Sequence, residues 1–187
     1  MELAKIYKLK IGDKAPDFNL PAVEGGNFTL DTFPLPYLVI FFTCNHCPYA
    51  LAYTERVKDA QQDFGGEVDF VGINSNDAES HPADSFEKMM EFRKENFINY
   101  MYLHDETQET AKAYGAQCTP HFFIFDKERK LVYQGRFDDN YEDASSVTKN
   151  DLRDALQALI DGKEISPNLT EAFGCSIKWK PGNEPNK

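Results

Sequence analysis

Unbroken apolar runs and helix-spaced apolar stripes alternate along this chain. Residues 37–42, Tyr-Leu-Val-Ile-Phe-Phe, contain no polar position, as expected of a central strand that is covered on both faces. An apolar stripe from Tyr53 to Phe64 follows at helical spacing, and Gly65-Gly66 then ends the predicted helix. Residues 68–73 read as a second strand. This order of elements predicts an α/β fold with a buried sheet.

The remaining residues continue the alternation of helix and strand patterns. The further predicted elements are, in order, a helix carrying Phe86, Met89, Met90 and Phe97, a short strand over 101–103, one or two helical turns over 107–114, a β-hairpin over 121–125 and 131–135, and a helix over 152–160. Apolar positions also alternate over residues 11–30 around Gly25-Gly26, which predicts a small hairpin ahead of the core.

These elements predict one domain over residues 1–187. It comprises an N-terminal hairpin extension over 1–33, the α/β core, and a C-terminal tail over 163–187.

Composition supports a packed globule and excludes several partner classes. The chain is 41% hydrophobic and 13% aromatic over 187 residues, which suits a real core. Its formal net charge of −11 would repel nucleic acid and anionic membrane surfaces. No apolar run approaches the roughly 18 residues of a membrane span, and the segment from Met1 to Lys5 lacks a signal-peptide profile. We therefore expect a cytoplasmic protein.

Two of the four cysteines form a C-x-x-C motif, Cys44-Asn45-His46-Cys47, directly after the first apolar run. A strand that delivers this motif to the start of a helix places the first sulfur near free backbone N–H groups, which favour the thiolate. The spacing predicts Cys44 as the accessible nucleophile and Cys47 as the resolving thiol. A protonated His46 would add a positive charge beside the thiolate.

Three further stretches carry a resemblance to known families. Gly12-Asp-Lys-Ala-Pro-Asp-Phe-Asn-Leu20 is similar to the opening of AhpC/TSA-type peroxiredoxins, and Cys47-Pro48 resembles their peroxidatic Cys-Pro. The stretch from Gly174 to Trp179 resembles the tails of peroxiredoxin-like proteins of the thioredoxin superfamily. The resemblance implies a thioredoxin-like three-layer α/β/α sandwich with a central mixed sheet.

The stretch Cys118-Thr119-Pro120-His121 resembles the cis-proline loop that faces the C-x-x-C motif in thioredoxin folds. The resemblance implies a cis peptide bond before Pro120 and a Thr119 backbone that pairs with an extended substrate. We also assign Asn45 to substrate binding.

The resulting hypothesis is a thiol–disulfide oxidoreductase without cofactor or metal. It would act on protein or small-molecule disulfides and depend on a reducing partner, while its oligomeric state stays open. Cys118 and Cys175 are possible accessory thiols: Cys175 would resolve a second disulfide, pair with Cys118, or be a small buried hydrophobe.

Three alternatives remain open. The first is a thiol peroxidase with Cys47 as the peroxidatic residue, although the sequence departs from that pattern: Cys44 replaces Thr or Ser, Ile40 replaces Pro, and Thr119 or Pro120 occupies the arginine position. The second is a non-catalytic redox-sensing module. The third is a metal-binding module, because the two cysteines of the motif and the pair Cys118/His121 have zinc-ligand spacing.

The remaining polar residues are expected to have no catalytic role. A buried carboxylate near the dithiol is not expected on the first strand, because Leu38 occupies the position at which several related families place one. Glu55 and Asp77 are expected to be solvated charges, and His81 and His104 to be surface residues. Arg136 is expected at the surface or in an ion pair.

Overall fold

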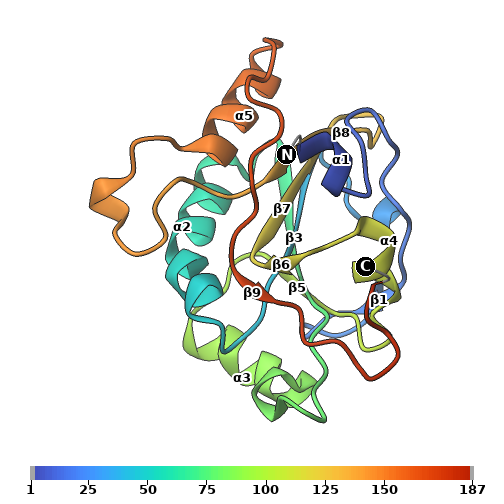
Figure 1. Ribbon diagram of the computed structural model, residues 1–187. Coiled ribbons are helices and arrows are strands. Elements are labelled where there is room, and N and C mark those ends of the chain that lie inside the picture. The colour runs from blue at the N-terminus through green and yellow to red at the C-terminus, as the bar shows by residue number, and fades with distance from the viewer. Residues whose placement is uncertain (1–2, 186–187) are drawn as a thin grey trace.

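A five-stranded mixed sheet forms the centre of the molecule (Figure 1). The computed structural model describes residues 3–185. Residues 1–2 of the predicted N-terminal extension and residues 186–187 of the predicted tail lie outside the described residues. The strand order is β5-β4-β3-β7-β8; β3, β4 and β5 pair in parallel, whereas the β3–β7 and β7–β8 pairs are antiparallel. The strands are β3 (Tyr37–Phe42), β4 (Val68–Asn74), β5 (Met101–His104), β7 (His121–Phe125) and β8 (Leu131–Gly135).

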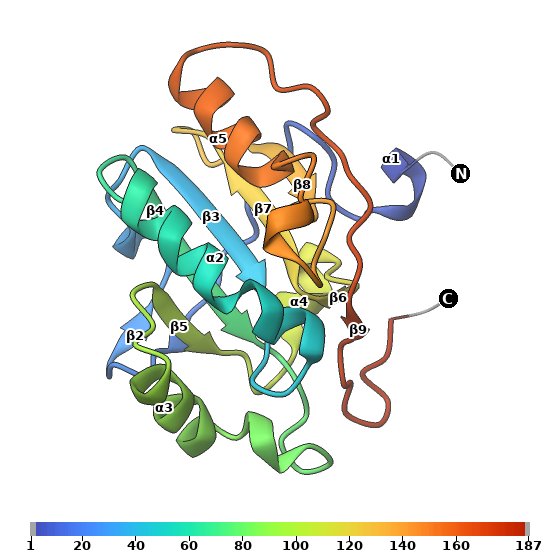
Figure 2. The same ribbon diagram turned by 90° about the vertical axis from the view of Figure 1, so that its left-hand side faces the viewer.

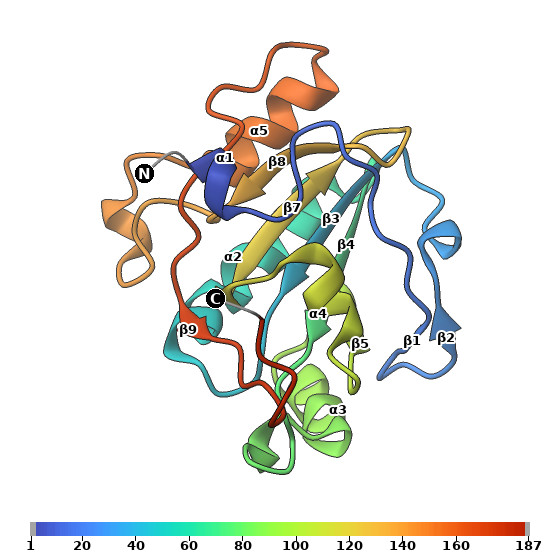
Figure 3. The same ribbon diagram turned by 45° about the vertical axis from the view of Figure 1, so that its right-hand side comes forward.

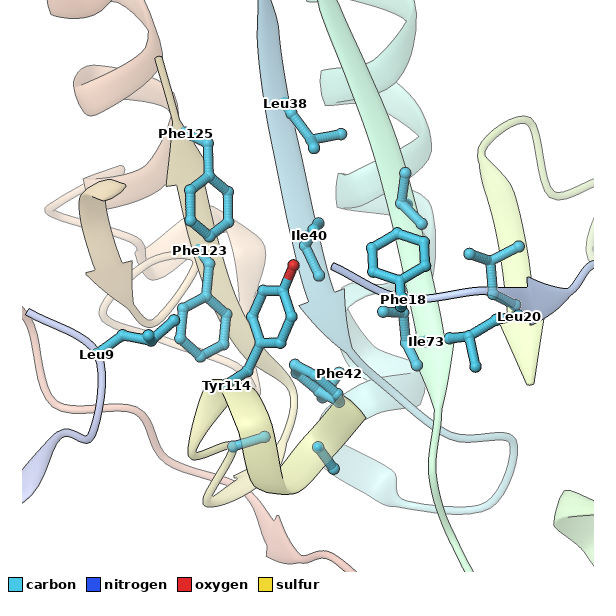
Figure 4. Packing of buried hydrophobic residues seen from close by; sticks show 14 of the residues in the cluster. Leu9, Phe18, Leu20, Leu38, Ile40, Phe42, Ile73, Tyr114, Phe123 and Phe125 are labelled. Atoms are coloured by element: carbon cyan, nitrogen blue, oxygen red, sulfur yellow. The ribbon is translucent and has the colours of Figure 1, made fainter. Parts of the chain in front are cut away.

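Both faces of the central strand β3 are buried, which explains its unbroken apolar run. Leu38, Ile40 and Phe42 point into one hydrophobic cluster, and the intervening residues point into another. Figure 4 shows the first cluster, in which the rings of Tyr114 and Phe123 meet edge to face at 5.6 Å. Alternate side chains of a strand point to opposite faces, so a strand that is covered on both faces buries every side chain and favours apolar residues throughout.

Helices cover the two faces of the sheet in three layers, as predicted. In Figure 1, α2 (Pro48–Phe64) and α5 (Asp151–Ile160) lie on one face, and α4 (Glu109–Tyr114) lies on the other with the N-terminal segment. A further helix, α3 (Phe86–Glu95), packs beside β5 (Figure 2). The short helices are α1 (Leu3–Ile6), η1 (Leu30–Thr32), η2 (Pro82–Asp84) and η3 (Ala144–Ser146). Among the residues 3–185, no helix is both long and apolar enough to span a bilayer.

The helix predicted around Phe86 and Met89 is present as α3, but two of the residues predicted to be on its buried face are exposed. Met89 is fully buried, whereas Met90 is 48% exposed and Phe97 is 81% exposed. Phe97 also lies beyond the helix end and has a positive φ of 51°. The helix packs at the sheet edge through one narrow line of contact, so helical spacing alone assigned too many residues to the core.

The predicted N-terminal hairpin is present. Strand β1 (Leu20–Pro21) pairs antiparallel with β2 (Asn27–Phe28), and Gly25 and Gly26 both have a positive φ in the turn between them. An isolated bridge between Ala22 and Leu103 joins this hairpin to the edge strand β5. The hairpin therefore extends the fold beside the sheet.

The C-terminal tail runs back along the whole molecule after α5 (Figure 3). It first passes β8, where Thr170 N donates to Gln134 O at 3.1 Å and Thr170 O accepts from Tyr7 Oη at 2.7 Å. It then forms β9 (Cys175–Ser176), which pairs antiparallel with β6 (Cys118–Thr119). Hydrogen bonds at both places make the tail an integral part of the fold.

Gly135 is the position where the tail approaches β8 most tightly. A Cβ there would lie 2.1 Å from Thr170 Oγ1 and 2.4 Å from Thr170 O, and the residue has a φ of +147°. We predict that Gly135→Ala lowers the free energy of unfolding by about 1–3 kcal/mol, because overpacking of a tight contact has this cost. Urea unfolding measures it, and Gly66→Ala, whose Cβ meets nothing within 4 Å, is the control. Equal stability of the two variants would contradict the tight contact.

Candidate active site

The two cysteines of the motif lie where the central strand passes into the first long helix. Strand β3 ends at Phe42, and α2 begins at Pro48 with Cys47 as its N-cap residue. Proline is favoured at a first helical position because its missing N–H would have no partner there. Cys44 therefore lies in the connecting loop and Cys47 at the helix start, and both are free thiols.

Thr119 contacts both sulfur atoms. Cys44 Sγ lies 3.3 Å from Thr119 Oγ1, and Cys47 Sγ lies 3.3 Å from Thr119 O, to which the protonated Cys47 thiol donates. The peptide bond between Thr119 and Pro120 is cis. The fold thus brings the predicted dithiol and the predicted substrate loop into direct contact.

Both cysteines are buried, so the expectation that Cys44 is accessible is wrong. Cys44 is only 2% exposed and Cys47 is not exposed at all. Two segments cover them. The tail places Cys175 against the pair, and the η2 loop accepts a hydrogen bond from Asn45 N. Both covering segments are distant in sequence, and no local pattern places them there.

Hydrogen bonds around the pair favour a thiolate at Cys47, the reverse of the predicted order. The Cys44 thiol donates to Cys47, and this bond is the largest cause that lowers the pKa of Cys47. Burial opposes it, whereas the Cys175 thiol and the backbone N–H groups of Ala50 and Cys175 add to it. The same thiol–thiol bond raises the pKa of Cys44, together with burial and the charge of Asp84. Cys47 is therefore the sulfur that ionises first.

A buried carboxylate that sequence reasoning missed, Asp84, organises the covering loop. Its side chain is fully buried; Oδ1 accepts from Asn45 N at 2.7 Å, and Oδ2 accepts from Asn76 Nδ2 at 2.8 Å. Oδ2 also lies 2.6 Å from His46 Nδ1. Leu38 occupies the position on β3 where related families bury a carboxylate, whereas Asp84 comes from η2 and lies beside Cys44 and His46. One aspartate among 31 acidic residues carries no local mark of burial.

The two residues between the cysteines make their contacts within the protein. Asn45 Nδ2 donates to Ala83 O at 2.9 Å, and its Oδ1 accepts from Tyr102 Oη at 2.8 Å. The His46 ring stacks on the His81 ring at 5.4 Å, and the His46 side chain keeps 31% exposure. Asn45 thus anchors the η2 loop to the sheet, which is a different placement from the substrate contact predicted for it.

Two of the residues expected at the surface are buried. His104 is 8% exposed, and burial lowers its pKa. Asp77 is 3% exposed, with its Oδ2 accepting from Ser80 Oγ at 2.6 Å. His81 is half-buried. These expectations are wrong because distant segments cover both side chains: the Phe86 ring lies 5.7 Å from the His104 ring, and Asp77 N donates to Lys178 O in the tail. By contrast, Glu55 is exposed, as expected.

The predicted zinc quartet is not assembled. His121 is fully buried between the rings of Tyr7 at 5.1 Å and Phe123 at 4.3 Å. Within the described part of the chain, one group of three potential ligands gathers instead, with its ligand atoms within 4.8 Å of one another: Cys44, His46 and Asp84. These are ligand types that zinc accepts.

The two accessory thiols differ in their surroundings. Cys118 is 6% exposed, its thiol donates to Pro120 O at 3.5 Å, and burial raises its pKa to about 12. Cys175 is half-buried, and burial together with its hydrogen bond to Cys47 raises its pKa to about 11. In the β6–β9 ladder Cys175 lies opposite Thr119 rather than opposite Cys118.

A mixed five-stranded sheet with a dithiol at the start of its first long helix defines a thioredoxin-fold oxidoreductase. Comparison with known proteins identifies the family. The AhpC/TSA family model matches residues 11–134, and the chain belongs to that family. A Mycobacterium tuberculosis protein named as a candidate peroxiredoxin is 30% identical over 115 residues, which is 61% of this chain and 69% of that relative.

Solved structures agree with the fold. An uncharacterized conserved protein from Geobacillus kaustophilus is 41% identical and superimposes with a TM-score of 0.88, covering 94% of this chain and 96% of that one. A candidate thiol:disulfide interchange protein, DsbE, from Chlorobium tepidum is 21% identical, with a TM-score of 0.64 over 83% of this chain and 98% of that one. The predicted thioredoxin-like, peroxiredoxin-like class is therefore confirmed.

The Asp84 charge should control the ionisation of Cys44. We predict that Asp84→Asn lowers the pKa of Cys44, because the buried carboxylate disfavours a second negative charge beside it. The comparison is made in a Cys47→Ser background, so that only Cys44 of the motif can react. The pH profile of its iodoacetamide alkylation should shift to lower pH in Cys47→Ser/Asp84→Asn. A profile that is unmoved or shifted upward would contradict this electrostatic assignment.

Proposed function

We propose that this protein is a thiol–disulfide oxidoreductase that uses Cys44 and Cys47 as its dithiol. Disulfide exchange needs a nucleophilic thiolate and a second thiol able to attack the mixed disulfide. The observation that carries the proposal is the contact of both sulfurs with Thr119: Cys44 Sγ lies 3.3 Å from its hydroxyl oxygen and Cys47 Sγ lies 3.3 Å from its carbonyl oxygen. This geometry places two thiols together at the predicted substrate loop, and the lowered pKa of Cys47 favours it as the attacking sulfur.

The structure supports Cys47 rather than Cys44 as the attacking sulfur. The Cys47 thiolate attacks one sulfur of a substrate disulfide, forms a mixed disulfide and releases the other sulfur as a thiolate. Cys44 then loses its proton and attacks Cys47, which releases the second substrate thiolate and leaves the pair oxidised. Asp84, whose carboxylate lies within 4.8 Å of Cys44 Sγ, is positioned to accept that proton.

The proposed partners are protein or small-molecule disulfides and a reducing partner that restores the dithiol. Thiol chemistry of this kind needs no cofactor. A cytoplasmic location belongs to the same proposal, because a reducing compartment would keep the pair in its dithiol form.

Trapping the mixed disulfide tests which sulfur attacks. The experiment uses a Cys175→Ser background, which removes the third thiol near the pair. With oxidised glutathione, Cys44→Ser/Cys175→Ser should accumulate one glutathione on Cys47, because the resolving thiol is absent. Cys47→Ser/Cys175→Ser should accumulate none, and intact mass with peptide mapping reads the result. Glutathione trapped on Cys44 instead would overturn the order of attack, and trapping on neither would overturn the function.

A thiol peroxidase that uses Cys47 is a second candidate, favoured by the lowered pKa of Cys47 at the N-terminus of α2 and by the peroxiredoxin name of the Mycobacterium tuberculosis relative. The thiolate would attack a peroxide, giving a sulfenic acid and an alcohol or water. Arg136, however, is held in an ion pair with Asp151 at 2.7 Å, as its sequence position suggested.

Peroxide consumption separates this candidate from disulfide exchange. A peroxidase requires that Cys44→Ser still consumes hydrogen peroxide at a rate that depends on Cys47. We expect consumption far slower than disulfide exchange, because Arg136, which could otherwise stabilise the leaving oxygen, is paired with Asp151. Rapid consumption by Cys44→Ser would make the peroxidase the main function.

A further inference from the structure

The edge of the Thr119 loop is already occupied by the protein's own tail. Strand β9 pairs antiparallel with β6, so that Thr119 lies opposite Cys175 and Cys118 lies opposite Ser176 (Figures 1 and 3). The family resemblance assigned the Thr119 backbone to an extended substrate segment. A peptide that pairs with this edge would therefore have to take the place of β9.

The residue before Cys175 is a glycine for a steric reason. A Cβ at Gly174 would lie 2.2 Å from Thr119 O and 3.2 Å from Pro120 N, distances that a side chain cannot occupy without displacing the backbone. Its φ is not in the left-handed region, so close approach rather than backbone conformation requires the glycine. The tail is thus fitted to the loop at this point.

Contacts on both sides hold the two-residue strand in place. Upstream, the Phe173 ring packs against the rings of Tyr49 at 6.3 Å and Tyr141 at 6.1 Å. Downstream, Lys178 O accepts from Asp77 N at 2.8 Å, and Lys178 N donates to Asn76 Oδ1 at 2.9 Å. The aromatic group sits over the start of α2 and the downstream bonds join the loop after β4, so β9 is anchored across the dithiol.

Cys175 is the cysteine that this strand presents to the dithiol. It packs against the cluster of Cys44, Cys47 and Ala50, and it lies opposite Thr119, whose carbonyl oxygen is 3.3 Å from Cys47 Sγ. Cys47, in turn, is completely covered. A substrate cysteine in exchange has to reach this same sulfur.

We propose that residues 173–176 are an internal substrate strand, in which Cys175 takes the place of a substrate cysteine and closes a disulfide on Cys47. The proposal rests on the function proposed above and adds its regulation. While β9 is paired, Cys47 is shielded from protein substrates. Displacement of β9 opens the Thr119 edge to an external strand.

A small disulfide is the oxidant in the internal exchange. The Cys47 thiolate attacks one sulfur of the disulfide, whose S–S bond breaks, and one small thiolate leaves. The Cys175 thiolate then attacks Cys47, forming the Cys47–Cys175 bond and releasing the second small thiolate. Two electrons pass from the protein thiols to the small disulfide, and the two thiol protons end on the released thiolates.

Disulfide mapping in Cys44→Ser tests the internal exchange. After treatment with oxidised glutathione, we expect a Cys47–Cys175 disulfide, no retained glutathione and a free Cys118. A stable Cys47–glutathione adduct with free Cys175 would overturn the internal strand while leaving the proposed function intact. No reaction at Cys47 in this variant or in its Cys175→Ser counterpart would overturn both.

Displacing the strand tests the shielding. Gly174→Ala should raise the rate at which oxidised glutathione modifies Cys47 by about tenfold or more, because the added methyl overlaps Thr119 O. Gly66→Ala, whose methyl would meet nothing, is the matched control and should react at the wild-type rate. Near-ultraviolet circular dichroism checks that both variants are folded. A folded Gly174→Ala that reacts no faster than wild type would overturn the shielding.

Discussion

The contacts of Thr119 are the constraint on which the rest of the site depends. Its hydroxyl lies against Cys44, its carbonyl against Cys47, and its backbone pairs with Cys175. One residue therefore contacts or pairs with three cysteines, two from the motif and one from the distant tail. The flanking strands β3 and β7 are antiparallel neighbours, with Phe42 opposite His121, so the sheet itself holds the Thr119 loop beside the dithiol. Packing of the apolar sheet thus determines how Thr119 lies relative to the two sulfur atoms.

Burial changes what the dithiol can do. Removing a thiolate from water is costly unless hydrogen bonds replace its solvation. Cys47 receives such bonds from Cys44, Cys175 and backbone N–H groups, whereas Cys44 faces the buried charge of Asp84. Two adjacent cysteines are thereby given different roles by their surroundings rather than by their order in the motif. Because Cys47 is buried, a protein substrate can reach its sulfur only after the tail has moved. The reactivity of Cys47 therefore depends on the conformation of residues 173–176.

The sequence predicted the sheet well because its signals are local. Residues 37–42 are all apolar because both faces of the strand are covered, and residues 68–73 are interrupted by a charge at Asp69 alone; both patterns are visible without a partner. The motif and the Thr119 loop were also found locally, each beside a strand. Asp84, the burial of Cys44 and the pairing of Cys175 with Thr119 were missed for one reason. Each depends on a contact between segments far apart in the chain, and neither periodicity nor spacing encodes such a contact.

The central claim is that Cys47, and not Cys44, carries the thiolate at neutral pH. Thiolate absorbance at 240 nm, followed during a pH titration, measures it most directly in wild type, Cys44→Ser and Cys47→Ser. We expect wild type to show a thiolate that titrates well below the ordinary cysteine value of about 8.5, and Cys44→Ser to keep it because the serine hydroxyl can donate to Cys47 in place of the thiol. Cys47→Ser should lack it. A thiolate with a low pKa that persists in Cys47→Ser and disappears in Cys44→Ser would contradict the account.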